Sequence, residues 1–207
     1  MNVEPSRLES HLRFFLKKGF KPINCRDFRA GLDRRSVIFT FDDAYESALT
    51  YGLEVLERNK SVGTFYAVAG LVGSTSTWDS GKERPLAGWV SLRKAQAAGM
   101  EIGNHTVSHP RVADLTLEAQ RQEWTQAQQI LSGNEIQATT ACYPYGSYNS
   151  ESQSILQSQG YTAAVALGKR TASRNDDPFQ LPRIVVAFSD GLPKLLYKMH
   201  LRPHLPR

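Results

Sequence analysis

Long apolar runs are missing from this chain, and so is a leader pattern at its start. No stretch reaches the roughly 18 apolar residues that a membrane-spanning helix needs. The first residues do not join a charged start to an apolar segment, as a secretory signal peptide does. Taken as it stands, the sequence therefore predicts a cytoplasmic protein, whereas a truncated N-terminus would make it extracytoplasmic.

Cysteine is scarce, and concentrated charge is missing. Cys25 and Cys142 stand far apart and form no CxxC pair, so we expect two buried thiols, with a disulfide as the alternative. The net charge is +5, but Lys and Arg are scattered without interleaved aromatics, so nucleic acid is not a predicted partner. Such a mildly basic surface suits anionic glycans or phospholipid headgroups.

The sequence alternates between short apolar runs typical of buried strands and segments with the apolar spacing of a helix. Of the 207 residues, 41% are hydrophobic, enough for one domain over residues 1–207. Strands are predicted at 36–41, 63–68, 100–104, 139–142, 162–166 and 181–186. Helices are predicted at 7–18, 45–59, 91–98, 117–131, 150–159 and 191–200, the first with a capping box of Ser6 and Glu9. This order predicts parallel strands joined by crossover helices, as in an α/β barrel.

Polar motifs follow several of these strands. Asp42 and Asp43 end the first apolar run, and His105 and His109 follow a later one. One carboxylate and two imidazoles can bind a divalent metal and leave a position open for water, as catalytic zinc sites do. The second carboxylate could then take a proton from that water, which is the chemistry of hydrolysis.

Each motif also has a purely structural interpretation. An Asp before a helix is a common N-cap, although one cap does not need both Asp42 and Asp43. A lone histidine is more often structural, whereas two at this spacing can share an ion. The pattern is not HExxH, because Thr106 follows His105, so a helical metalloprotease is excluded.

Two further segments could complete such a site. The stretch Tyr143-Pro-Tyr145-Gly146 is either an ordinary turn or a backbone N–H donor near Tyr145 aimed at a developing oxyanion. Arg183 is an isolated cation in an apolar strand and should have a carboxylate partner, for which Asp42 is a candidate. An ordinary surface arginine is the alternative.

Thr-Phe-Asp42-Asp43, His105-x-x-x-His109 and Tyr-Pro-Tyr145-Gly146, in this order, resemble the polysaccharide deacetylase family, the NodB-homology carbohydrate esterases, in its branch with YPYG and LPRI motifs. The resemblance implies an irregular (β/α)7-type barrel, and whether this chain includes its first strand is left open. It also implies a metal, most often zinc, on Asp43, His105 and His109.

By the same resemblance, Asp42 is the general base and the Tyr145 backbone N–H stabilises the oxyanion. The implied activity removes N-acetyl groups from an amino sugar in a polysaccharide, peptidoglycan or glycolipid, and releases acetate. An N-acetylated glycan or glycolipid is then the partner, and the oligomeric state is left open.

The chain departs from the family pattern at four points. Ala44 replaces the glycine of TFDDG, and Cys142 replaces the arginine of RxPY, a role that Arg183 could take over. The DxxDW motif is absent, with only a loose echo at Asp176-Asp177-Pro178. The LxH histidine that acts as general acid is also missing, because His200 falls on a predicted helix.

Three functions remain from the sequence. The first is a metal-dependent N-deacetylase. The second is a carbohydrate-binding pseudoenzyme that keeps the metal site without the acid. The third is a related amidohydrolase that acts on a cyclic amide. Trp78 and Trp89, at the far side of the long loop 70–88, favour stacking on a sugar face.

Overall fold

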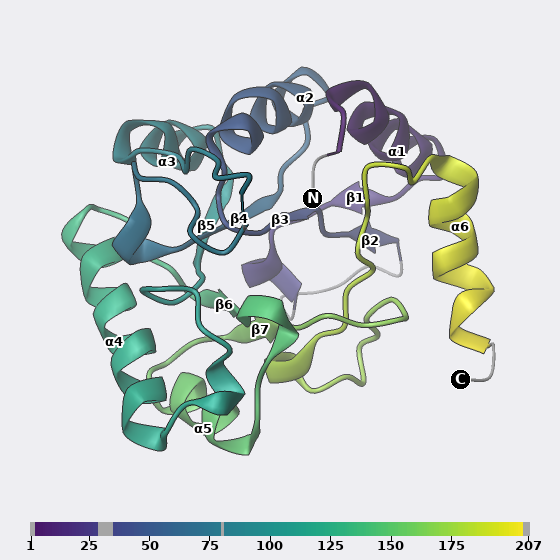
Figure 1. Cartoon of the computed structure of the whole chain (residues 1–207). Helices are drawn as coiled ribbons and strands as arrows, with labels where there is room; N and C mark the ends of the chain where they lie inside the picture. Colours follow the sequence, from purple (N-terminus) through teal and green to yellow (C-terminus); the bar gives the residue numbers. More distant parts are fainter. Residues whose placement is uncertain (1–2, 29–34, 80, 205–207) are drawn as a thin grey trace.

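A parallel sheet of five short strands forms the centre of the protein. We describe a computed structural model in which residues 3–28, 35–79 and 81–204 are placed. The strands are β3 (Thr40–Phe41), β4 (Thr64–Ala67), β5 (Glu101–Asn104), β6 (Thr140–Cys142) and β7 (Ala163–Val165). They lie in chain order, β3-β4-β5-β6-β7, and every pair is parallel. Figure 1 shows the sheet curled into half of a barrel, as the alternating sequence pattern predicts.

A second, two-stranded parallel sheet extends this half-barrel at its first edge. It consists of β1 (Lys21–Pro22) and β2 (Ser36–Val37). The run predicted as one strand, 36–41, is therefore divided: its first half pairs with β1, and its second half, as β3, pairs with β4. The sequence did not predict β1.

The predicted strand at 181–186 does not form a regular strand. Leu181 bridges Val165 and Ile184 bridges Gly168, both in parallel orientation, so the segment still runs beside β7. Between these bridges lies Pro182, which has no backbone N–H to donate to a ladder. The segment nevertheless delivers Arg183 to the same end of the barrel as the other strands.

Six helices surround the sheet (Figure 1). They are α1 (Pro5–Lys17), α2 (Leu53–Arg58), α3 (Trp89–Ala97), α4 (Leu117–Gly133), α5 (Ser150–Ser158) and α6 (Leu192–His200). The helix predicted at 45–59 begins as a π-type turn, Ala48–Gly52, before α2. The predicted Ser6–Glu9 capping box is wrong: α1 starts at Pro5 without a side-chain cap, because proline is favoured in the first helical position.

The core is divided between the two sides of the curled sheet. Helices α1 to α4 cover the outside of β3, β4 and β5 with the largest cluster, which includes Leu12, Leu56, Phe65 and Leu131. Inside the curl, Tyr66 packs with both cysteines, which are free and buried, as expected. No helix among the described residues is long and apolar enough to cross a membrane. The first two residues and Arg207, the end of the basic tail, lie outside the described residues.

Candidate active site at the carboxyl ends of the strands

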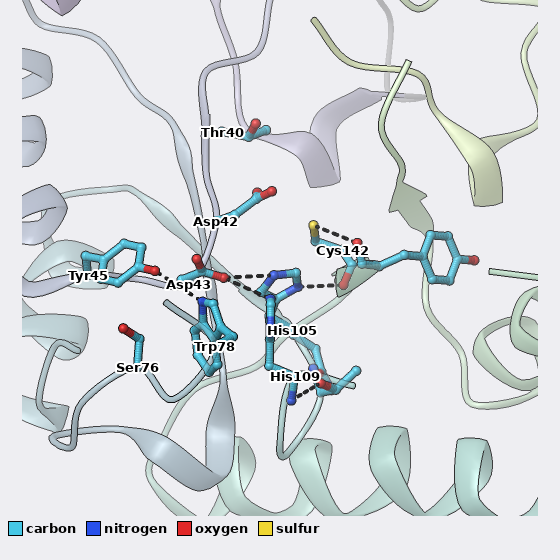
Figure 2. Close-up of polar contacts among 12 residues, drawn as sticks. Thr40, Asp42, Asp43, Tyr45, Ser76, Trp78, His105, His109 and Cys142 are labelled. Carbon is cyan, nitrogen blue, oxygen red and sulfur yellow. Dashed lines mark hydrogen bonds and ion pairs between the residues drawn. The ribbon is translucent and has the colours of Figure 1, made fainter. Parts of the chain in front are cut away.

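The polar motifs of the sequence meet at one end of the half-barrel, because parallel strands place their carboxyl ends on the same edge. Asp42 and Asp43 follow β3, and His105 follows β5. Cys142 is the last residue of β6. Figure 2 shows the Asp43 carboxylate facing both imidazoles. The sequence therefore predicted that these motifs meet at this end of the sheet.

Asp43, His105 and His109 converge on a single point. Asp43 Oδ1 lies 3.2 Å from His105 Nε2 and 3.2 Å from His109 Nε2. Both imidazoles are buried. Burial raises the pKa of Asp43, but hydrogen bonds from the two histidines outweigh it, so this pKa lies well below its usual range. The three side chains are thus arranged as a compact, ionised donor set.

This donor set fits a divalent metal. One ligand atom from each of the three side chains can lie within 4.8 Å of the others, and two imidazole nitrogens with one carboxylate oxygen are a common ligand set of hydrolytic zinc. Asp42, His105 and Cys142 meet the same distance criterion. That second set is the poorer candidate, because Arg183 engages both Asp42 and the Cys142 sulfur.

The protein fixes the ring of His105 through its second nitrogen. His105 Nδ1 lies 2.7 Å from the backbone carbonyl oxygen of Cys142, so this nitrogen carries the proton and donates it to that oxygen. The other nitrogen, Nε2, faces Asp43 and is the one that would bind a metal, as is usual for a histidine held in this way. Cys142 thus contributes its backbone carbonyl oxygen to the site, a role that cannot be predicted from the type of its side chain.

A network of hydrogen bonds shapes the loop that carries both histidines. Thr106 N donates to Asn104 Oδ1 over 2.8 Å, and His109 N donates to Thr106 Oγ1 over 3.0 Å. Glu123 of α4 accepts from the backbone N–H groups of Val107 and Ser108, at 2.9 and 3.0 Å. Glu123 carries no motif and was missed by sequence reasoning.

Arg183 holds Asp42 in a two-pronged ion pair. Nη1 lies 2.6 Å from Asp42 Oδ1, and Nη2 lies 2.9 Å from Asp42 Oδ2. Nη1 also donates to Thr40 Oγ1. Burial raises the pKa of Asp42, but the charge and hydrogen bonds of Arg183 more than offset this, so the pKa is lowered. The pairing of Arg183 with Asp42 was predicted and is confirmed, and it keeps Asp42 ionised.

Tyr145 lies in the turn Pro144–Gly146, directly after β6 and beside the histidines. Its backbone has φ 58°, and its ring centroid lies 4.7 Å from that of His109. The ring is 43% exposed, so it lines the entrance to the site. The geometry brings the Tyr145 turn to the donor set, as the sequence predicted.

Trp78 reaches the site from the loop 70–88 and stacks on a histidine. Its ring centroid lies 3.9 Å from that of His109, with 27° between the planes. Trp78 Nε1 donates to Tyr45 Oη (Figure 2), and Tyr45 donates to Asp79 Oδ2 over 2.6 Å. Trp89, by contrast, begins α3 and packs against the main core. The sequence indicated a role for Trp78 but not this contact.

The remaining histidines lie elsewhere in the part of the chain that the structure describes. His200 is exposed at the end of α6, and His11 is buried on α1. Among the histidine side chains that are placed, only His105 and His109 belong to the site. The sequence-based expectation that His200 does not take the place of the family's acid agrees with this arrangement.

Comparison with known proteins shows to which family the chain belongs. The family model described as polysaccharide deacetylase matches residues 29–164. The chain belongs to the polysaccharide deacetylase family. The match contains the Asp42–Asp43 motif, both histidines and the Tyr145 turn, whereas Arg183 lies beyond its end.

Curated relatives of this deacetylase-family chain are distant but extend along most of it. YxkH of Bacillus subtilis is 22% identical over 194 residues, which are 90% of this chain and 66% of that protein. A poly-β-1,6-N-acetyl-D-glucosamine N-deacetylase of Staphylococcus aureus is 20% identical over 201 residues, which are 90% of this chain and 68% of that protein. The chain thus spans about two thirds of the length of these relatives.

Solved structures confirm the fold. The Streptococcus pyogenes deacetylase PplD, in complex with acetate, superposes with a TM-score of 0.80 at 21% identity, over 96% of this chain and 88% of that one. IcaB from Ammonifex degensii gives a TM-score of 0.79 at 21% identity, over 93% and 88% of the two chains. The single-domain barrel predicted from the sequence is therefore correct.

Proposed function

We propose that this chain is a metal-dependent deacetylase that removes N-acetyl groups from an amino sugar of a polysaccharide, peptidoglycan or glycolipid, and releases acetate. The observation that carries the proposal is the convergence of Asp43, His105 and His109 next to an Asp42 that Arg183 holds ionised. The named activity of the staphylococcal relative supports the substrate class.

Asp43, His105 and His109 would hold the metal, for which zinc suits the donor set best. When bound, zinc acts as a Lewis acid and makes water a nucleophile at neutral pH. The chain itself supplies the orientation: the Cys142 carbonyl fixes His105, and Asp43 keeps its charge between two imidazoles.

Asp42 is the proposed general base. An ionised carboxylate can accept a proton from water, and the fork of Arg183 fixes the direction in which its oxygens point. The Tyr145 backbone N–H is the proposed donor to the oxyanion that forms when the acetamide carbonyl is attacked. In this proposal the base, the metal ligands and the donor all come from the carboxyl end of the sheet.

Acetate release tests the proposal directly. We expect the zinc-loaded protein to release acetate from β-1,6- or β-1,4-linked N-acetylglucosamine oligomers, and a chelator to abolish the release until zinc is restored. Asp42→Asn should lower the rate about 100-fold or more while zinc content stays unchanged, because the base is lost and the three proposed ligands are kept. Asp114→Asn, which alters an exposed carboxylate, serves as the matched control and should keep full activity.

The same experiment separates the alternative function. A carbohydrate-binding pseudoenzyme is favoured by the lack of a third histidine at the site among the placed side chains. It predicts bound zinc and saturable binding of the oligomers without any acetate. Turnover that depends on Asp42 would exclude this alternative, and binding without turnover for every acetylated glycan tried would overturn the deacetylase.

A further inference from the structure

The two histidines of the proposed metal site differ in what holds their rings. His105 donates from Nδ1 to the Cys142 carbonyl oxygen over 2.7 Å. His109 Nδ1 is buried and has no hydrogen-bond partner among the described residues. A metal-binding imidazole is normally oriented by a hydrogen bond from its second nitrogen. When Nε2 binds a metal, His109 must therefore be oriented by something other than a hydrogen bond from Nδ1.

The indole of Trp78 is the group that contacts His109 face to face. The centroids are 3.9 Å apart and the planes differ by only 27°, a stacked arrangement that aromatic rings favour. Tyr145 also approaches His109, but its ring is tilted by 60° at 4.7 Å and is 43% exposed. The His105 ring meets His109 edge-on at 4.9 Å, so among the described residues Trp78 is the group that stacks on the face of this imidazole.

Trp78 is itself tied in place by a chain of hydrogen bonds. Its Nε1 donates to Tyr45 Oη over 3.2 Å. Tyr45 donates to Asp79 Oδ2 over 2.6 Å, and Ser76 Oγ donates to the same oxygen over 3.2 Å. Tyr45 and Ser76 are buried. The corner 76–79 is thus anchored beneath the site, with the indole laid on His109 (Figure 2).

We propose that Trp78, held by Tyr45 and Asp79, is a positioning residue that orients the His109 imidazole for metal binding in place of the missing hydrogen bond. The inference rests on the proposed metal site. It assigns to the loop 70–88 a task in building the site, in addition to any contact with the glycan. Replacing the indole should therefore weaken metal binding before any substrate is present.

Zinc affinity, measured by competition with a chromophoric chelator, is the first readout. We expect Trp78→Leu to lower the affinity about tenfold or more, the size of effect seen when a ligand loses its support. Trp78→Phe keeps a stacking ring and should lose much less. Tyr45→Phe removes only the hydroxyl tether and should fall between them. Thr77→Ala, at an exposed neighbour, is the control and should bind zinc normally.

Two spectroscopic signatures distinguish orientation from a loss of folding. The absorption bands of the Co²⁺-substituted protein should shift in Trp78→Leu and stay unchanged in Thr77→Ala. In the metal-free protein, the His109 Cε1–H resonance should move downfield when the indole is removed, because the ring current of the stacked partner is lost. If Trp78→Leu does not fold, the zinc affinity and spectra of Trp78→Phe and Tyr45→Phe are compared with those of the wild type instead.

The outcomes separate this inference from the proposed function. Wild-type zinc affinity and cobalt spectrum in folded Trp78→Leu would overturn the positioning role while leaving the deacetylase intact. An unshifted His109 resonance would overturn the stacking itself. Failure of the wild-type protein to bind zinc, with the ring-current shift present, would instead remove the metal site and with it the positioning role.

Discussion

At the scale of single residues, the site is built on unusual backbone conformations. Of the seven non-glycine residues with positive φ among those described, five lie at or beside the site: Asp43, Ala44, Thr106, His109 and Tyr145. A left-handed conformation costs an L-residue roughly 1–2 kcal/mol. Such strain gathers at functional sites, where the surrounding fold enforces it. The loops after β3, β5 and β6 therefore hold conformations that their own sequences do not favour.

Ala44 offers a direct test of this strain. It has φ 48° and is buried, at the position where the family pattern has glycine. Ala44→Gly should gain about 1 kcal/mol of stability from relieved backbone strain. It should lose about 0.8 kcal/mol of stability because the buried methyl group is removed. Ala67→Gly, the matched control in β4, loses its methyl group without relief. We expect urea unfolding to show Ala44→Gly as more stable than Ala67→Gly by about 1 kcal/mol.

Equal destabilisation of the two variants would show that the Ala44 backbone carries no strain. The same comparison explains why TFDDA is a mild departure from TFDDG. The alanine keeps the path of the chain and adds buried apolar surface, so the gain and the loss are of similar size.

At the scale of elements, α4 supports the site although it contributes no ligand. Glu123 accepts two backbone N–H groups of the histidine loop and the Ser108 hydroxyl, the last at 2.6 Å. A carboxylate that accepts three hydrogen bonds fixes a loop more firmly than a neutral group does. The helix therefore sets the spacing between His105 and His109.

Glu123→Ala should release this loop. We expect zinc affinity to fall about tenfold, within the range typical for loss of a supporting group, and amide exchange at Val107 and Ser108 to become faster. Glu118→Ala removes an exposed carboxylate that accepts a hydrogen bond from Gln122 in the same helix, and it should leave both unchanged. Normal zinc affinity in folded Glu123→Ala would mean that the loop keeps its shape without α4.

The elements also show where sequence reasoning succeeds. The bounds of helices and buried strands with a clear apolar period were predicted to within a few residues. The acids and histidines that follow these strands were also predicted to lie together. The run 36–41 was predicted as one strand because periodicity reports burial and says nothing of which neighbour a residue pairs with. The segment 181–186 has a strand's composition, yet Pro182 interrupts its ladder. Trp78, Glu123 and the Cys142 carbonyl act through contacts between distant segments, which no local pattern encodes.

At the scale of the whole molecule, Asp190 joins the C-terminal helix to the body. Its side chain is fully buried and accepts from Ala187 N over 2.7 Å. Lys198 also donates to it, and Lys194 lies 2.9 Å away. Figure 1 shows α6 beside α1 at the edge of the molecule. On the α1 side, the charged or titratable neighbours of this junction are His11 and Arg7, and Arg7 donates to the Phe188 carbonyl oxygen.

The junction predicts a pH dependence of stability. Burial raises the pKa of Asp190, but the Ala187 N–H and the two lysines outweigh it and lower the pKa to about 2. The unfolded value is near 3.9, so Asp190 stabilises the fold above about pH 4, and the contribution is lost as the pH falls toward 2. Asp190→Asn should cost about 1–2 kcal/mol at pH 7, with a difference from wild type that shrinks below pH 4.

Urea unfolding of both proteins at several pH values measures this difference. Burial lowers the pKa of His11 and the charge of Asp190 partly offsets this, so the measured difference also includes the changed titration of His11. A difference that stays constant from pH 7 to pH 2 would mean that Asp190 acts through its shape and hydrogen bonds alone.

The ion pair between Arg183 and Asp42 also has a consequence for the order in which the site forms during synthesis. The three proposed ligands and the Tyr145 turn all lie within residues 42–145, whereas Arg183 comes much later in the chain. Because a chain is synthesised from its N-terminus, the metal-binding half of the site leaves the ribosome first. The proposed base gains its fixed direction only after the segment beside β7 has followed. A nascent chain would thus be able to bind the proposed metal before its proposed base is held in place.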